Sequence, residues 1–269
     1  RWSIEASYFQ DDVIRSIERV ITDKQLGYIP GSVEWADFDP TATSNAIAML
    51  DFADALPPGP LETMLATYLD GFHRKHRGEM PWTNYTAYEI RIIGAFVRLG
   101  KRDTANELLD FFLSDRRPLP WNQWPEISWK DLRAPGHLGD VPHTWIAAEY
   151  LLALTSMVAE EREASSSIVL AGGMRWEWIA EDNGFSVRNL PTRFGKLDFM
   201  IRADEDSNLI IHVGGKFHLP GGGLFVTPPL PAGKRMVGTE HLLGECAIEE
   251  DGLCLSILRL PFECRILLE

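Results

Sequence analysis

Aromatic and titratable side chains gather in one stretch of the sequence, WNQWPEISWKDLRAPGHLGDVPHTW, which runs from residue 121 to residue 145. The stretch holds four tryptophans, two histidines and three acidic residues. Connecting segments of this length are uncommon in compact domains unless they are functional or disordered, and disordered segments are poor in tryptophan. Flat indole faces stack on the C–H face of a sugar ring, and acidic, amide and imidazole groups bond its hydroxyls. The composition therefore predicts a carbohydrate site.

Two carboxylates in this stretch are the candidates for catalysis. Glu126 lies between Trp124 and Trp129, where aromatic walls could hold a sugar and desolvate the carboxylate, so it is the first candidate for acid–base chemistry. The alternative for Glu126 is a loop glutamate that bonds backbone amides. Asp140 precedes Pro142, and it is either a second candidate base or a cap of the following helix.

Further candidate sugar contacts come from three segments that precede helix-like sequence. They are aromatic, amide, imidazole or acidic side chains: Glu34, Trp35 and Asp37, then Trp82, Asn84, Tyr85 and Glu89, then Trp121, Gln123, Trp124, Trp129 and His143. The alternative for the tryptophans is that they cap a hydrophobic core and touch no ligand. Glu89 and Glu149 lie inside apolar helical sequence, where pairing with another buried group is the alternative to a function. Asp39 is expected to cap a helix that begins at Pro40.

The elements that must position these residues are helices before about residue 165 and strands after it. Apolar periodicity predicts outer, amphipathic helices at 9–23, 60–76 and 101–114, and inner helices that are apolar almost all round at 40–56, 84–99 and 142–157. Three such α-hairpins predict half of an (α/α)6 toroid over residues 1–165, with the candidate loops meeting at one rim. Short alternating segments predict a small antiparallel β-sandwich over residues 166–269. The expected fold class is α+β.

The order of these motifs resembles a known family. EWADFDPTA, PWTNYTAYEIRIIGAFVRLG, WNQWPEISW and GDVPHTWIAAEY, followed by FSVRNLPTRFGKLDFMIR, resemble the C-terminal part of bacterial six-hairpin glycosidase-like proteins, over roughly residues 8–230. The resemblance implies a glycoside hydrolase that inverts with two carboxyl groups. Inverting hydrolysis needs a general acid and a general base about 6.5–9.5 Å apart. Because only three of six hairpins are present, the resemblance also implies that this chain holds the base but not the acid, with Glu126 as the first candidate for the base and Asp140 as the second. A non-catalytic carbohydrate-binding protein and a polysaccharide lyase or phosphorylase are the alternatives.

Composition narrows the expected partners. The formal net charge is -13 and no basic stripe is present, which disfavours nucleic acid and anionic membranes as partners. No apolar run approaches the length needed to span a bilayer. Half a ring would leave apolar helix flanks exposed, so we expect the missing N-terminal half of the barrel or a homodimer to cover them. The start at Arg1 without a methionine suggests a processed or truncated N-terminus and leaves export open, with a periplasmic or extracellular location slightly favoured.

Neither a metal nor another cofactor is predicted. His137 and His143 lack further ligands at metal-binding spacing. Cys246, Cys254 and Cys264 are an odd number without C-x-x-C spacing, which favours buried free thiols over a metal knuckle or a disulfide framework.

Overall fold

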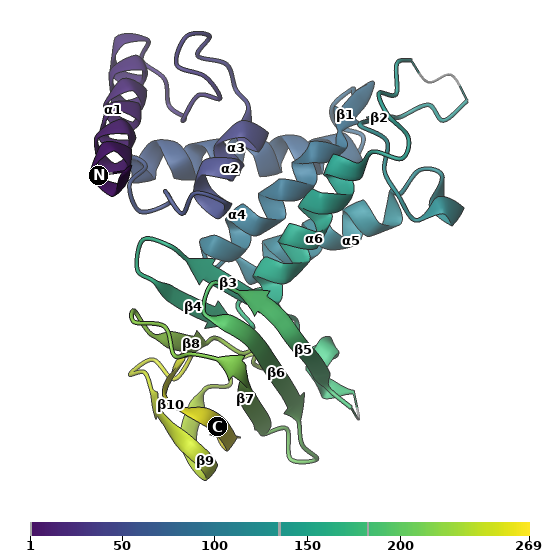
Figure 1. Ribbon diagram of the computed structural model, residues 1–269. Coiled ribbons are helices and arrows are strands. Elements are labelled where there is room, and N and C mark those ends of the chain that lie inside the picture. The colour runs from purple at the N-terminus through teal and green to yellow at the C-terminus, as the bar shows by residue number, and fades with distance from the viewer. Residues whose placement is uncertain (1, 134–135, 182) are drawn as a thin grey trace. The chain divides into compact units, whose positions relative to one another are not determined.

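The computed structural model describes residues 2–133, 136–181 and 183–269 (Figure 1). Two residues of the tryptophan-rich stretch, Ala134 and Pro135, lie outside the described residues. The chain divides into two compact units. Unit 1 comprises Arg1–Ala95 and Leu108–Ala153, and unit 2 comprises Phe96–Glu107 and Leu154–Glu269. Within the described ranges, no helix combines the length and the apolar composition that crossing a membrane requires.

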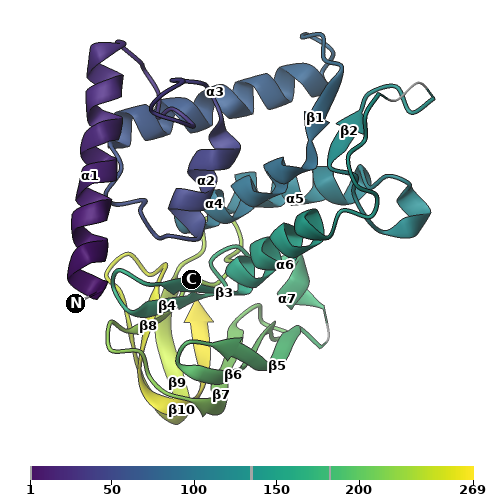
Figure 2. The same cartoon turned by 45° about the horizontal axis from the view of Figure 1, so that its top comes forward.

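The chain up to Val158 is mostly helical (Figure 2). Its elements are α1 (Trp2–Asp23), α2 (Pro40–Ala48), α3 (Pro58–His76), β1 (Asn84–Thr86), the 3-10 helix η1 (Ala87–Arg91), α4 (Ile92–Arg98), α5 (Arg102–Ser114), the 3-10 turn η2 (Leu119–Trp121), β2 (Ile127–Trp129) and α6 (Thr144–Val158). The predicted start of α2 is confirmed: Pro40 is its first residue, and Asp39 Oδ1 accepts from the amides of Thr41 at 2.9 Å and Ala42 at 3.2 Å.

The expected inner helices differ from the observed ones. The segment 40–56 is helical only to Ala48, and the segment 84–99 divides into a strand, a 3-10 helix and the short α4. The strand forms because Tyr85 pairs with Ser128 in an antiparallel ribbon, β1 with β2. Helical periodicity within one segment carries no information about a partner strand further along the chain, such as Ser128, 43 residues after Tyr85. The third segment begins at Thr144, two residues after Pro142.

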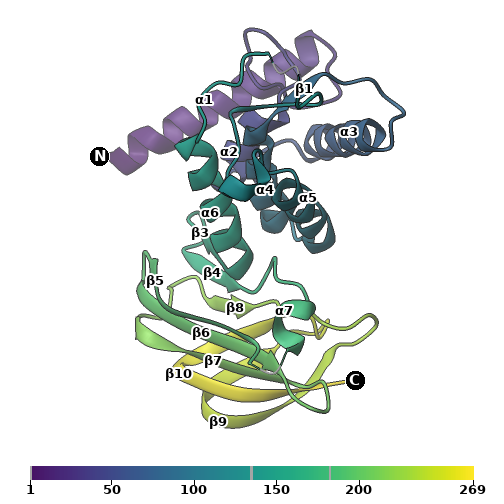
Figure 3. The ribbon, with the colours of Figure 1, turned by 90° about the vertical axis from the view of Figure 1, so that its right-hand side faces the viewer.

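Strands dominate unit 2, where Figure 3 shows β5, β6, β7, β10 and β9 side by side in that order. Its elements are β3 (Ala159–Arg162), β4 (Ser167–Leu170), a single helical turn α7 (Glu177–Ala180), β5 (Phe185–Thr192), β6 (Gly195–Ala203), β7 (Leu209–Phe217), β8 (Leu224–Val226), β9 (Met236–Ile248) and β10 (Leu255–Leu268). The hydrogen-bonded order is β3-β4-β8-β10-β7-β6-β5, and β9 pairs with β10. The pair β4–β8 is parallel and the other pairs are antiparallel.

The expected fold, an α-hairpin toroid followed by a small antiparallel β-sandwich, is wrong. The eight strands form one mixed sheet that closes into a nearly complete barrel. Alternating burial, as in Leu197, Phe199 and Ile201 of β6, shows that one face of a strand is covered. A β-sandwich and a β-barrel give the same alternation, because the covering layer is a second sheet in the sandwich and the opposite side of the same sheet in the barrel. The helices also fail the toroid: an inner helix would be buried all round, whereas α6 leaves Trp145 and Leu151 exposed.

Candidate functional site

The backbone of Glu126 is fixed from two directions within unit 1. Its carbonyl accepts from the Ala87 amide at 3.1 Å and from the Thr86 hydroxyl at 3.3 Å, at the start of η1. Its amide donates to the carbonyl of Asp140 at 3.4 Å. Hydrogen bonds to the backbone of Glu126 therefore hold the tryptophan-rich segment to the start of η1, and they fix the position of Glu126.

The carboxylate of Glu126 lies against Gly139. A Cβ at residue 139 would stand 2.1 Å from Glu126 Oε2 and 2.6 Å from Glu126 Cβ, and Gly139 has φ +67, so only glycine fits this position without strain. Glu126 is half-buried. Among the residues that the structure describes, none forms a hydrogen bond or ion pair with its carboxylate. Its lone pairs are thus available to a ligand or a water molecule.

A tyrosine–histidine pair lies beside this carboxylate. The Tyr88 hydroxyl and His143 Nε2 are 2.7 Å apart, and His143 Nδ1 is 3.7 Å from Asp140 Oδ2. Burial and the negative charge of Glu126 raise the pKa of Tyr88, so its hydroxyl keeps its proton at neutral pH. The hydroxyl forms a hydrogen bond with one ring nitrogen of His143, and the other ring nitrogen faces the Asp140 carboxylate. Asp140 is not the N-cap of α6, because that helix begins four residues later.

An ion pair and an exposed indole border the same group. Arg91 Nη2 lies 2.7 Å from Glu149 Oε1, and the Arg91 guanidinium stacks 4.4 Å from the centre of the Tyr88 ring. The Trp145 ring lies edge-on to Tyr88, with centroids 6.4 Å apart, and its side chain is 68% exposed. The two groups most free to meet a ligand are therefore the Glu126 carboxylate and the face of Trp145.

A cavity of about 720 Å³ lies on the tryptophan-rich segment, also within unit 1. Its lining includes the indoles of Trp121 and Trp129, the cations Arg116 and Arg117, and Pro125, the neighbour of Glu126. Trp129 is fixed there because its Nε1 donates to the carbonyl of His137 at 2.9 Å. A cavity of this volume suits a ligand the size of one or a few sugar rings.

Several candidate binding residues serve the interior of unit 1 instead. Trp124 is 4% exposed and donates through Nε1 to the carbonyl of Phe112 at 2.8 Å, so its indole offers no open face. Tyr85 is buried and donates to Asp115, and Tyr68 donates to Glu89 Oε2 at 2.8 Å. For Glu89 the structure therefore favours the pairing alternative.

The remaining candidates are exposed or half-buried. Trp82 is half-buried between His76 and Tyr85, with Lys130 Nζ 5.5 Å from its ring centre. Asn84 is exposed, and the buried Nε2 of Gln123 makes no hydrogen bond within the described ranges. In the segment before α2, Trp35 is 84% exposed and Glu34 is also exposed, whereas Asp37 accepts from the Ser32 amide at 3.0 Å and closes the loop on itself.

Sequence reasoning missed Tyr88 and Arg91 as members of the cluster, and it placed Trp145 only among the loop tryptophans. Tyr88 follows Tyr85 and Thr86 in TNYTAYE, and a hydroxyl-rich turn at the start of a helical segment was its only signal. Unit 2 also holds a cavity, of about 800 Å³, where the sequence showed no chemistry; it is lined by Lys101, Arg102 and Glu160 among others. Arg102 is occupied there by the carbonyls of Gly172 and Thr227.

Comparison with protein-family models, curated proteins and solved structures finds no match to this chain. The function is therefore inferred from the chemistry of the residues in unit 1.

Proposed function

We propose that unit 1 binds a carbohydrate and hydrolyses its glycosidic bond with Glu126 as the general base. The observation that carries the proposal is the Glu126 carboxylate, which is half-buried, fixed through its backbone and free of hydrogen-bond partners among the described residues. A base must accept a proton from water, and a carboxylate whose lone pairs already bind amides or cations is a poor one.

The neighbours of Glu126 have supporting roles in this proposal. Tyr88 and His143 form a hydrogen-bonded pair 2.7 Å apart, and the tyrosine oxygen can accept a hydrogen bond from a sugar hydroxyl or the attacking water. The exposed Asp140 carboxylate lies 3.7 Å from His143 Nδ1 and adds negative charge beside the pair. The exposed face of Trp145 and the cavity walls Trp121 and Trp129 supply stacking surfaces. The general acid is not assigned to a residue of this chain.

A polysaccharide lyase is the second candidate, and the Tyr88–His143 contact is the observation that favours it. Eliminative cleavage uses a tyrosine or histidine to remove the proton next to a uronate carboxylate, and a cation must neutralise that carboxylate. The Arg91 guanidinium stacks on the Tyr88 ring, but Glu149 already pairs with it at 2.7 Å. The acidic surroundings therefore favour hydrolysis over elimination.

The test is a screen of the chain, with and without candidate partner proteins, against neutral and anionic oligosaccharides. Hydrolysis releases a saturated reducing end, and proton NMR of the first-formed anomer reports inversion. Elimination instead gives an unsaturated product that absorbs in the ultraviolet. Binding by calorimetry without turnover would identify the third alternative, a non-catalytic carbohydrate-binding protein, and would refute the hydrolase proposal.

Substitution of Glu126 then tests the assignment of the base. Glu126→Gln should lower kcat by about 10²–10⁴-fold with little change in KM, because the amide cannot accept the proton while the stacking surfaces remain. Glu62→Gln, on the exposed face of α3, is the matched control and should keep the parental rate. If Glu126→Gln keeps its rate and Asp140→Asn loses it, the base is Asp140.

We also propose that a partner covers apolar side chains of unit 1, either a further segment of protein or a second copy of this chain. Leu151 and Leu152 on α6 are 62% and 50% exposed, and Tyr8 and Phe9 on α1 are 64% and 71% exposed. Monomeric proteins rarely leave large contiguous apolar patches in water. No nucleic acid or membrane is expected among the partners.

A further inference from the structure

The long strands β9 and β10 of unit 2 are bent by an irregularity in their pairing. Between the pairs Arg259–Glu245 and Glu263–Leu243, three residues of β10 oppose the single residue Gly244 of β9. Pro261 lies in this break and has no N–H for a regular ladder. Opposite it, Gly244 has φ +80, and a Cβ there would meet the carbonyl oxygens of Arg259 and Pro261 at 2.7 Å. The break is therefore built into both strands.

The break brings together residues that a regular strand would keep apart. His241 and Cys246 are five positions apart, so in an unbroken strand they would face opposite sides at a separation of about 16 Å. Here His241 Nε2 and Cys246 Sγ are 3.9 Å apart. Cys264 is the cross-strand partner of His241, and one ligand atom from each of the three residues lies within 4.8 Å of the others.

These separations fit a bound metal ion. Zinc bonds sulfur at about 2.3 Å and imidazole nitrogen at about 2.0 Å, so neighbouring ligand atoms in a tetrahedral site are about 3.5–3.8 Å apart. The cluster needs a closure of at most about 1 Å to reach that geometry. His241 is exposed and can supply the adjustment by rotating its side chain, whereas Cys264 is buried and Cys246 half-buried. Access from solvent is therefore through His241.

We propose that His241, Cys246 and Cys264 form a binding site for a thiophilic metal ion such as Zn²⁺, with a fourth coordination position open to water or another ligand. Two sulfurs and one imidazole are donors that soft and borderline cations prefer over Ca²⁺ or Mg²⁺. Cysteine binds a metal as the thiolate, and a bound cation stabilises that form against protonation. The site is independent of the proposed hydrolysis in unit 1.

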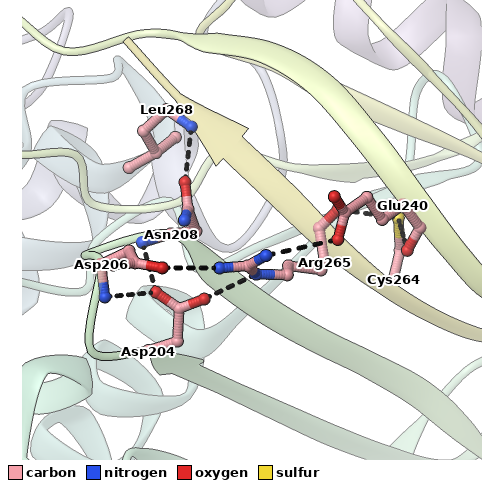
Figure 4. Close-up of polar contacts among 7 residues, drawn as sticks. All are labelled: Asp204, Asp206, Asn208, Glu240, Cys264, Arg265 and Leu268. Carbon is pink, nitrogen blue, oxygen red and sulfur yellow. Dashed lines mark hydrogen bonds and ion pairs between the residues drawn. The ribbon is translucent and has the colours of Figure 1, made fainter.

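The residue pair next to the cluster fixes the strand register there. Arg265 and Glu240 are cross-strand partners adjacent to Cys264 and His241, with Arg265 Nη1 3.4 Å from Glu240 Oε2. In the other direction Arg265 contacts Asp204 and Asp206 (Figure 4). Arg265 Nε lies 2.7 Å from Asp204 Oδ2, and Nη2 lies 3.1 Å from Asp206 Oδ2. Successive side chains of a strand point to opposite faces, so these ion pairs hold β10 in place from the face opposite the metal ligands.

The test uses the full chain, reduced and freed of metal with a chelator, titrated with Co²⁺ and then with Zn²⁺. Tetrahedral Co²⁺ bound through cysteine gives visible d–d bands and a sulfur-to-cobalt charge-transfer band, and Zn²⁺ should displace it and abolish both. Equimolar binding is expected. Loss of outer-shell partners alone weakens metal binding about 10–100-fold, so Cys246→Ser and His241→Ala, which each remove a ligand, should weaken it by at least about 100-fold.

Cys254→Ser is the matched control, because Cys254 is a half-buried thiol outside the cluster and its loss should leave the titration unchanged. Circular dichroism of each variant checks folding. Because His241 is exposed, His241→Ala removes a ligand without altering the buried Cys264. Cobalt bands that persist in Cys246→Ser or disappear in Cys254→Ser would overturn the proposal. So would a Cys246–Cys264 disulfide in the isolated protein combined with no metal binding after its reduction.

Discussion

Substitution of Gly139 by alanine tests the position of Glu126 from the opposite side of the contact. The added Cβ would stand 2.1 Å from Glu126 Oε2, 2.9 Å from Cδ and 2.6 Å from Cβ. Rotation of the Glu126 side chain relieves the first two contacts but not the third, because Cβ is fixed to the backbone. The segments must therefore separate, which weakens the 3.4 Å bond from the Glu126 amide to the Asp140 carbonyl.

Gly139→Ala should lower the stability of the protein in two ways, through the backbone conformation of residue 139 and through overpacking against Glu126. An alanine in the left-handed region costs about 1–2 kcal/mol, and the smaller entropy of the unfolded chain offsets about 0.4–1 kcal/mol of this. Overpacking adds about 1–3 kcal/mol. Gly78 separates the two, because it has φ +76 but nothing within 4 Å of the Cβ position. Gly78→Ala should thus destabilise by about 1 kcal/mol and Gly139→Ala by about 2–4 kcal/mol.

The activity contrast should be larger than the stability contrast. A displacement of about 1 Å in a catalytic group can cost about 10²-fold in rate, so folded Gly139→Ala should lose about that much hydrolysis while Gly78→Ala keeps the parental rate. Urea unfolding gives the free energies, and initial rates at a temperature where both variants are folded give the activity. Equal stability loss in the two variants would refute the packing argument. Equal rates would refute the role of Glu126.

Three further predictions concern unit 1. Arg91→Met leaves the Glu149 carboxylate buried and unpaired, so it should lower the free energy of unfolding in urea by about 3–5 kcal/mol. The double variant with Glu149→Met should recover most of this loss. A double variant as unstable as the single one would contradict the prediction. Burial raises the pKa of Glu89, although the hydrogen bond from the Tyr68 hydroxyl opposes the rise. The contribution of Glu89 to stability is therefore full below its pKa in the unfolded chain and is lost as pH rises through its pKa in the folded protein. Glu89→Gln cannot titrate and lacks this loss. The free energy of unfolding of the variant minus that of the parent should therefore increase as pH rises through this window, and a difference that does not change with pH would contradict the prediction. In light scattering coupled to size exclusion, the parent chain should self-associate or bind its partner, and the Leu152→Glu variant should do neither. A parent chain that stays a 30.4 kDa monomer and binds no partner would exclude the proposed contact.

Local chemistry was predictable from the sequence because it acts over a few residues. Asp39 before Pro40 predicted a capped helix start, and the apolar periodicity of residues 60–76 and 101–114 predicted α3 and α5. The three thiols are free, as their spacing predicted, although only Cys264 is fully buried. In each case the residues that determine the outcome are neighbours in the chain.

The tertiary structure decided whatever depends on partners far apart in the sequence. Alternation gave buried strand faces but not their closure into a barrel, because closure is set by the twist, bulges and order of the strands. Trp124 and Trp145 both lie in or next to one tryptophan-rich loop, yet one donates to Phe112 in the interior and the other is exposed. His241 and Cys246 meet because the pairing of their strand with β10 is broken at Gly244 and at Pro261, which lies fifteen residues after Cys246. The sequence alone determined which chemical groups are available, and the fold decided which of them meet, since contact depends on distance in space.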